Sequence, residues 1–388
     1  TPLPKAPLLI FACFCDILGY IMTKQKKREE KEKELLEKKQ ELERVKKPEA
    51  VTSLLMVDPM ELEVGYSLIP FIDPEQGGDF LDRITMIRRQ SALEQGIVVP
   101  PIRIRDNIQL PKDTYVIKIR GTEVGRGSLK GEYFLAMGEG DITKIPGEEA
   151  KDPTFGLPCK WIKEENKELA EEEGFTVVDP ASVMATHLTE TIRKYATSLL
   201  GRQETKTLID NIKEKYPSLV DELIPEPLSL GELQKVLHNL LSERVSIRDM
   251  VTILETLANW VNKTKEIGFL TEKVRQSLSR QITHQHQTAD GRLLVITVNP
   301  ALEEKIASVI QKTEEEERAN LSPDEINNIL KSLQGIMGKE AQQCVILTSP
   351  RVRRVFRNII MPYLPFTSVL SYDEIDVGVK VTSIGMIG

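Results

Sequence analysis

Hydrophobic and polar positions divide the chain into segments of different character, and the first is apolar. Residues 7–22 form an apolar run near the lower length limit for crossing a bilayer. Lys24, Lys26, Lys27 and Arg28 follow it directly, which marks the cytoplasmic side of a membrane segment. The flanks of a cleaved signal peptide are missing. The pattern favours the end of a transmembrane helix over residues 1–23, with a buried soluble helix as the alternative.

The next segment is dense in charge and helix formers. Residues 24–47 contain 11 Lys or Arg and 7 Glu, a charge of +4, and favourable i,i+4 pairs continue until Pro48. This predicts a solvated helical linker over residues 24–53. Its few apolar side chains cannot cover a stripe on their own domain, but they can contact a neighbouring copy: Leu35, Leu36, Leu42 and Val45. A spacer without such contacts is the alternative.

After the linker, the periodicity switches between strand and helix. It predicts a strand at 54–57, a helix at 79–95 closed by Gly96, and half-buried strands within 97–106 and 114–121. A Gly-rich stretch from Gly131 is typical of a small inserted module. Asp179 and Pro180 then open a helix that is expected to run to Gly201.

Residues 201–280 carry successive helical patterns, for which we expect Ser246 and Thr271 as N-caps. From Arg292 onward strands alternate with helices, which predicts a mixed or parallel sheet covered by helices. The fold class predicted is therefore α+β and multidomain, with a short N-terminal transmembrane remnant, a helical linker, an α+β part with an inserted module, an all-helical part and a C-terminal α/β part.

Composition argues for binding rather than catalysis. The net charge is −7 and the pI is about 5.5, so nucleic acid is not an expected partner. The four cysteines and four histidines have no metal-site spacing, and the GxGD at 138–141 lacks the context of a phosphate loop. We expect no enzyme, no catalytic residues, no cofactor and no metal. A hydrolase that uses a carboxylate and a histidine stays as an alternative.

Two features leave alternatives open. Arg351, Arg353 and Arg354 begin a helix, where they form either a solvated face or an interface for an acidic partner. Phe155 lies in a loop rich in Pro and Gly, DPTFGLP, and either plugs its own module or stands exposed as a binding anchor. The residues alone favour the solvated face and the plug.

Six stretches together resemble the family of flagellar and injectisome type III secretion export gates. They are VDPMELEVGYSLIP (57–70), LDRITMIRRQSALEQGIVVPPIRIRDN (81–107), DPTFGLP (152–158), VVDPASVMATHLTE (177–190), GRQETKTLID (201–210) and RVSIRDMVTILETLANW (244–260). DPTFGL and GRQE are more flagellar than injectisome-like. The chain begins with Thr1, and we expect it to be the C-terminal part of a longer protein.

The resemblance implies a non-enzymatic gate in the bacterial inner membrane, with this part facing the cytoplasm as a nine-membered ring. Such a ring docks export substrates, substrate-loaded chaperones, components of the export ATPase complex and other export-gate membrane proteins. It implies four subdomains, which here would cover 54–131 plus 181–200, the inserted 132–180, 201–280 and 281–388. An injectisome-type gate and a membrane-anchored scaffold without client docking are the alternatives.

The resemblance also implies a docking site. Asp152, Phe155 and Thr186 match positions at which the family receives substrate-loaded chaperones, at the junction of the first and second subdomains. On this basis Phe155 would line a small apolar dimple, Asp152 would place a carboxylate at its rim, and Thr186 would contribute from the adjoining helix.

Overall fold

The computed structural model describes residues 57–138, 140–312, 317–337, 344–365 and 367–388. The transmembrane segment predicted at 1–23 and the linker at 24–53, with Leu35, Leu36, Leu42 and Val45, lie outside these residues. Among the residues described, none of the helices combines the length and the apolar character that a membrane span requires. Pro59–Gly388 form one compact unit, and the subdomain boundaries predicted within it stay predictions.

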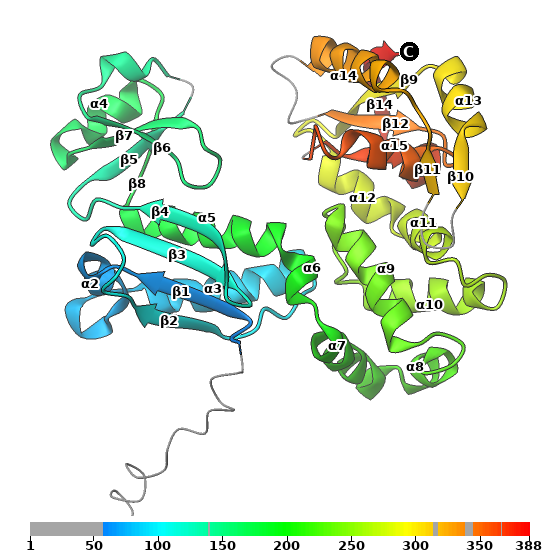
Figure 1. The fold of residues 1–388 in the computed structure, drawn as a ribbon, viewed down its shortest axis with the longest axis horizontal. Helices are drawn as coiled ribbons and strands as arrows, with labels where there is room; N and C mark the ends of the chain where they lie inside the picture. The colour runs from blue at the N-terminus through cyan, green and yellow to red at the C-terminus, as the bar shows by residue number, and fades with distance from the viewer. Residues whose placement is uncertain (1–56, 139, 313–316, 338–343, 366) are drawn as a thin grey trace, which may run out of the picture. The chain divides into compact units, whose positions relative to one another are not determined.

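The first sheet has the strand order β2-β1-β3-β4 (Figure 1). Strand β1 (Met60–Val64) pairs in parallel with β2 (Ile102–Asp106) and antiparallel with β3 (Thr114–Ile119), which continues into β4 (Thr122–Ser128). Strands β2 and β3 confirm the two strands predicted within 97–106 and 114–121. Strand β2 is half-buried as expected, whereas β3 is buried at nearly every position. Strand β1 was not predicted, and the strand predicted at 54–57 lies, except for Val57, outside the described residues.

Two helices pack together beside this sheet, α3 (Phe80–Glu94) and α5 (Pro180–Lys194). The helix predicted at 79–95 is confirmed by α3, and Gly96 follows it with φ +76. A Cβ on Gly96 would lie 2.3 Å from the backbone nitrogen of Arg248, so glycine permits this close approach of two chain segments.

Asp179 caps α5 as predicted, because its carboxylate accepts the Ser182 N–H at 2.9 Å. The predicted continuation to Gly201 is wrong. The backbone of Tyr195 leaves the helical conformation, and a separate short helix, α6 (Ala196–Leu199), follows.

A second, smaller sheet is entirely antiparallel and has the order β6-β7-β5-β8. Its strands are β5 (Phe134–Met137), β6 (Glu148–Lys151), β7 (Pro158–Ile162) and β8 (Thr176–Val178). With helix α4 (Lys167–Glu172) it encloses its own small core of Ala136, Ile145, Ile162, Ala170 and Phe175. Leu135, Cys159 and Trp161 of the same sheet instead join the main core, so the sheet packs on both of these clusters. The inserted module expected here stays a prediction.

Helices occupy the next part of the chain. They are α7 (Arg202–Lys215), α8 (Pro217–Leu223), α9 (Leu230–Ser242), α10 (Met250–Val261), α11 (Ile267–Ser277) and α12 (Ser279–His286). The predicted N-caps are wrong in two cases. Asp249, not Ser246, caps α10 by accepting the Thr252 N–H at 3.1 Å, and Thr271 lies inside α11, where its hydroxyl donates to the Ile267 carbonyl.

The C-terminal sheet is parallel throughout, in the order β13-β12-β9-β14. Its strands are β9 (Arg292–Val298), β12 (Cys344–Thr348), β13 (Val369–Ser371) and β14 (Lys380–Ile387), and its helices are α13 (Pro300–Ser308), α14 (Pro323–Met337) and α15 (Arg353–Ile360). This confirms the predicted α/β alternation. The short ribbon of β10 (Ile310–Lys312) and β11 (Glu317–Ala319) was not foreseen.

Buried ion pairs join the helical part to the C-terminal sheet. Arg353 is fully buried, and its guanidinium binds Glu243 at the end of α9 (2.6 Å from Nη1 to Oε2) and Glu272 of α11 (2.6 Å from Nε to Oε2). Its Nη1 also donates to the Val369 carbonyl at 3.2 Å. All three nitrogens of the guanidinium are therefore satisfied.

A second arginine extends this network. The Arg275 Nε donates to the buried Glu374, whose other oxygen accepts the Ser371 N–H at 2.8 Å. Burial alone would raise the pKa of the Glu243 carboxyl, but the guanidiniums of Arg275 and Arg353 hold this pKa at about 2. The expected solvated face is thus wrong for Arg353, although Arg351 is exposed.

Replacing Arg353 by Gln should strongly destabilise the fold. The substitution leaves Glu243 and Glu272 without their shared partner, and breaking a buried pair in this way costs about 3–5 kcal/mol. The free energy of unfolding in urea measures the effect. Arg351→Gln is the matched control, because Arg351 is exposed and lies 3.6 Å from Glu304, and it should change stability by less than about 0.5 kcal/mol. Equal effects of the two substitutions would contradict this account of the network.

Candidate functional site

The loop Asp152–Leu157 connects β6 to β7 in the small sheet and carries two of the predicted site residues. The Asp152 N–H donates to the Leu157 carbonyl, and the Gly156 N–H donates to the Asp152 carbonyl, both at 2.9 Å. Gly156 has φ +70, which favours glycine at the turn. The backbone of this loop, here called the Asp152 loop, is thus closed on itself.

Asp152 holds the loop from inside. The residue is 4% exposed, and its Oδ2 accepts the N–H groups of Thr154 (3.1 Å) and Phe155 (2.6 Å). The expectation that Asp152 offers its carboxylate at the rim of a dimple is therefore wrong, because backbone donors already engage a carboxylate that is turned inward. Asp152 fixes the position of Phe155.

Phe155 and Leu157 are the exposed apolar side chains of the Asp152 loop, with 60% and 56% of their surface accessible. The interpretation of Phe155 as a plug of its own module is wrong. Leu157 was not selected from the sequence, although its position between Gly156 and Pro158 in the same motif was a usable signal. The loop presents two neighbouring hydrophobic side chains on a backbone that its own hydrogen bonds restrain.

Thr186 is exposed on α5, next to the buried His187. The His187 Nδ1 lies 2.9 Å from the hydroxyl of Tyr115 on β3. Burial lowers the pKa of His187, and the nearby Asp152 carboxylate opposes that shift. The Asp152 loop, β3 and this turn of α5 therefore meet around one buried polar cluster: Asp152, Tyr115 and His187.

The same carboxylate affects the other groups packed there. Burial raises the pKa of Tyr115, and Asp152 raises it further. Burial and Asp152, in that order, also raise the pKa of the Cys159 thiol to about 11, so this cysteine stays a neutral thiol at neutral pH. This cluster could not be predicted from the sequence, since its three members come from three separate parts of the chain: the Asp152 loop, β3 and α5.

Two glycines of β4 make room for the cluster. A Cβ on Gly127 would lie 2.4 Å from the Tyr115 hydroxyl, and a Cβ on Gly125 would lie 3.0 Å from the His187 Nε2. Small residues on this strand therefore allow the large side chains of β3 and α5 to pack against it.

The described residues contain no cluster suited to binding a metal ion. Among them, no group of three or more His, Cys, Asp or Glu side chains is placed to hold a metal ion. Cys159 and Cys344 are both buried as free thiols. The candidate site is thus a surface of exposed apolar side chains on a rigid support, which suits protein docking.

These features belong to a mixed α+β protein in which a small sheet presents a loop beside a helix of the first sheet. A model of the FHIPEP family matches residues 1–380, and the chain belongs to this family. It is 46% identical to the flagellar biosynthesis protein FlhA of Bacillus subtilis over 394 aligned positions, covering 99% of this chain and 56% of that protein.

A second relative is the FlhA protein of Treponema pallidum, at 40% identity over 86% of this chain and 48% of that protein. The chain therefore spans about half the length of the curated relatives it matches. These matches confirm the resemblance on which the site residues were chosen.

Solved structures share the fold. The Chlamydia pneumoniae CdsV protein superposes with a TM-score of 0.78 at 30% identity, covering 86% of this chain and 98% of that one. CdsV in its complex with CdsO gives 0.75 at 28% identity over 86% and 98% of the two chains. The nonameric EPEC SctV-C gives 0.72 at 25% identity over 85% and 98%.

Removing the Asp152 carboxylate should destabilise the small sheet. Asp152→Ala deletes a buried charged acceptor of two backbone N–H groups, a loss of about 1.5–3 kcal/mol. Trp161 on β7 is 5% exposed and reports on this sheet, so urea unfolding is followed by its fluorescence in a Trp260→Phe background.

Phe155→Ala in the same background is the control, because an exposed side chain contributes less than about 0.5 kcal/mol to folding. If Asp152→Ala unfolds at the same urea concentration as the background protein, the carboxylate does not hold the loop.

Proposed function

We propose that residues 57–388 form the cytoplasmic docking platform of a flagellar type III protein export gate. The platform binds export substrates and substrate-loaded chaperones and delivers them for translocation. The client site comprises Phe155 and Leu157 of the Asp152 loop and Thr186 of α5. The protein resides in the bacterial inner membrane, with this part facing the cytoplasm.

The observation that carries this proposal is the contrast within one loop. Phe155 is 60% exposed, whereas Asp152 is 4% exposed and binds the Phe155 N–H at 2.6 Å. An exposed aromatic on a restrained backbone loses little conformational entropy when a partner covers it, and buried aromatic anchors dominate many interfaces. Leu157 enlarges the apolar surface, and Thr186 adds a hydroxyl and a methyl group nearby on α5.

The relatives support the flagellar assignment, since flagellar biosynthesis proteins match at 46% and 40% identity. The solved nonamer of EPEC SctV-C supports a nine-membered ring for this chain as well. The complex of CdsV with CdsO supports docking of a further protein, and we include components of the export ATPase complex and other export-gate membrane proteins among the partners.

Within the platform, we propose four subdomains with the second inserted into the first. Their ranges are 54–131 plus 181–200, 132–180, 201–280 and 281–388. The platform works by binding alone, as a non-enzyme that needs no cofactor and no nucleic acid.

Phe155→Ala should weaken binding of a substrate-loaded flagellar chaperone about thirtyfold. Loss of a desolvated aromatic anchor costs about 2 kcal/mol or more, and each 1.4 kcal/mol is a factor of ten in Kd. Calorimetric titration of the chaperone–substrate complex into the purified chain measures the change. The midpoint of thermal unfolding should stay unchanged.

Tyr66→Ala is the matched control, because Tyr66 is an aromatic of nearly equal exposure (61%) in another part of the chain, and it should bind like the parent protein. Equal Kd values for the parent and Phe155→Ala would reject the site. Absence of binding by the parent, to flagellar and injectisome chaperones alike, would favour the scaffold without client docking, whereas binding only of injectisome chaperones would favour an injectisome-type gate.

Ring assembly should depend on the charged linker. Residues 24–47 carry +4 and residues 48–388 carry −11, because residues 1–23 hold one charge of each sign, so linker and body of neighbouring copies attract. Exposed pairs contribute about 0–1 kcal/mol each and are screened by salt. Light scattering should show that a chain starting at Lys24 forms rings at lower concentration than one starting at Leu54, and that salt reduces the difference.

Replacing Leu35, Leu36, Leu42 and Val45 together by Ser separates apolar contacts from charge attraction. If the apolar contacts contribute, the variant with four Ser residues should assemble more weakly than the parent chain at every salt concentration. If the chain from Leu54 assembles as readily as the chain from Lys24, the linker has no part in ring formation.

A further inference from the structure

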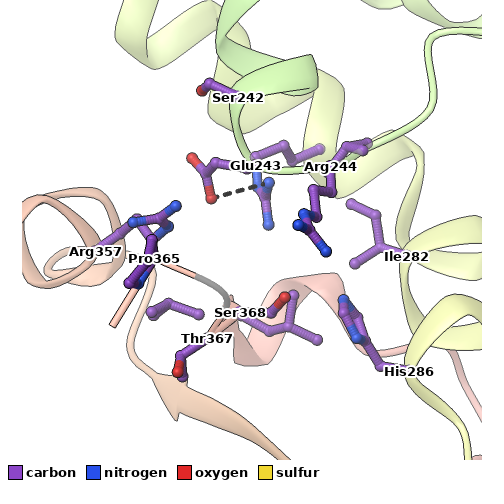
Figure 2. Close-up of a pocket in the computed structure, with 13 residues that line it drawn as sticks. Ser242, Glu243, Arg244, Ile282, His286, Arg357, Pro365, Thr367 and Ser368 are labelled. Atoms are coloured by element: carbon purple, nitrogen blue, oxygen red, sulfur yellow. Dashed lines mark ion pairs between the residues drawn. The ribbon is translucent and has the colours of Figure 1, made fainter. Parts of the chain in front are cut away.

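A small pocket lies where the end of α9 and helix α12 meet the C-terminal part of the chain. Its volume is about 20 Å³, which is room for one body the size of a water molecule or a chloride ion. Figure 2 shows the side chains of Arg244, Arg357, His286 and Ser368 around it, with Glu243 at its upper edge. Arg275 also lines the pocket.

The positive groups of this pocket exceed its negative ones. Arg357 is 5% exposed, and within the described part of the chain it takes part in no ion pair. Its Nη1 is buried without a hydrogen-bond partner, and so is the Nη1 of Arg275, which lies 3.2 Å from Glu243 Oε2 outside hydrogen-bond geometry. Two buried donors that line one cavity are thus available to a ligand.

The carboxylates nearby are already engaged. Glu243 is bound by Arg353 and Arg275, and both Glu272 oxygens accept from Arg353. Glu374 binds Arg275 and the Ser371 N–H. None of them is within ion-pair distance of Arg357.

The electrostatics of Arg357 agree with a missing counter-charge. Burial lowers the pKa of its guanidinium, Glu243 raises it, and the neighbouring charges of Arg353 and Arg275 lower it again. A buried cation without a partner is costly, and a water molecule would supply an acceptor but no charge.

We propose that this pocket binds a small monovalent inorganic anion of the size of chloride. The anion accepts from Nη1 of Arg275 and Nη1 of Arg357, and it links α15 to the helical part beside the Arg353 network. Gluconate is much larger than chloride, and it therefore serves as the comparison anion.

Halide-dependent stability tests the site. The 388-residue chain is unfolded thermally in sodium chloride, sodium bromide and sodium gluconate at constant ionic strength. We expect a saturable rise in the midpoint with either halide relative to gluconate. Arg357→Gln should abolish this rise, Arg357→Lys should retain most of it, and Arg351→Gln, which alters an exposed arginine outside the pocket, should leave it unchanged.

Anomalous diffraction from bromide is an independent test. It uses the parent chain, so it remains informative even if Arg357→Gln fails to fold. Crystals of the parent chain grown in bromide should show an anomalous peak between Arg275 and Arg357. A water molecule there without anomalous signal would overturn the proposal, and so would an equal halide response in the parent chain and Arg357→Gln.

Discussion

The described structure depends most on the pairing of buried charge around Arg353. A guanidinium that is removed from water is tolerated only if its donors and its charge are matched, and here two carboxylates from α9 and α11 and the Val369 carbonyl do so. Because these partners come from the helical part and from the C-terminal sheet, the match exists in only one arrangement of the two. The network therefore favours that one arrangement of the helical part and the C-terminal sheet.

The buried carboxylate of Asp152 in the small sheet has a different role from the Arg353 network. Asp152 is satisfied by backbone N–H groups two and three residues further along the chain, so its influence is local, and it fixes a loop rather than a junction. Because backbone hydrogen bonds to Asp152 hold the loop, the exposed side chains of Phe155 and Leu157 are not needed to stabilise it. A docking surface can be hydrophobic only where the fold does not need the same residues, and the Asp152 loop meets that condition.

The sequence predicted the elements better than the contacts between them. Helix α3 and the strands of the parallel sheet could be predicted from hydrophobic periodicity and from the residues that begin and end each element, which are local properties of the sequence. The role of Arg353 could not be predicted, because Glu243 is 110 positions away and a basic run at a helix start looks the same whether it is solvated or buried. Asp152 was assigned to a rim because the motif gives its position but not its hydrogen bonds. The caps of α10 and α11 were misplaced by a few residues, since several capping side chains stand close together there.

The small sheet has one more property that follows from its register. The chain enters it through β5 and leaves it through β8, and Leu135 faces Val178 across that pair, so entry and exit lie about 5 Å apart. A segment whose ends lie this close together can vary between relatives without moving the strands that flank it. The sequence of the Asp152 loop can therefore change between relatives while the first sheet stays the same.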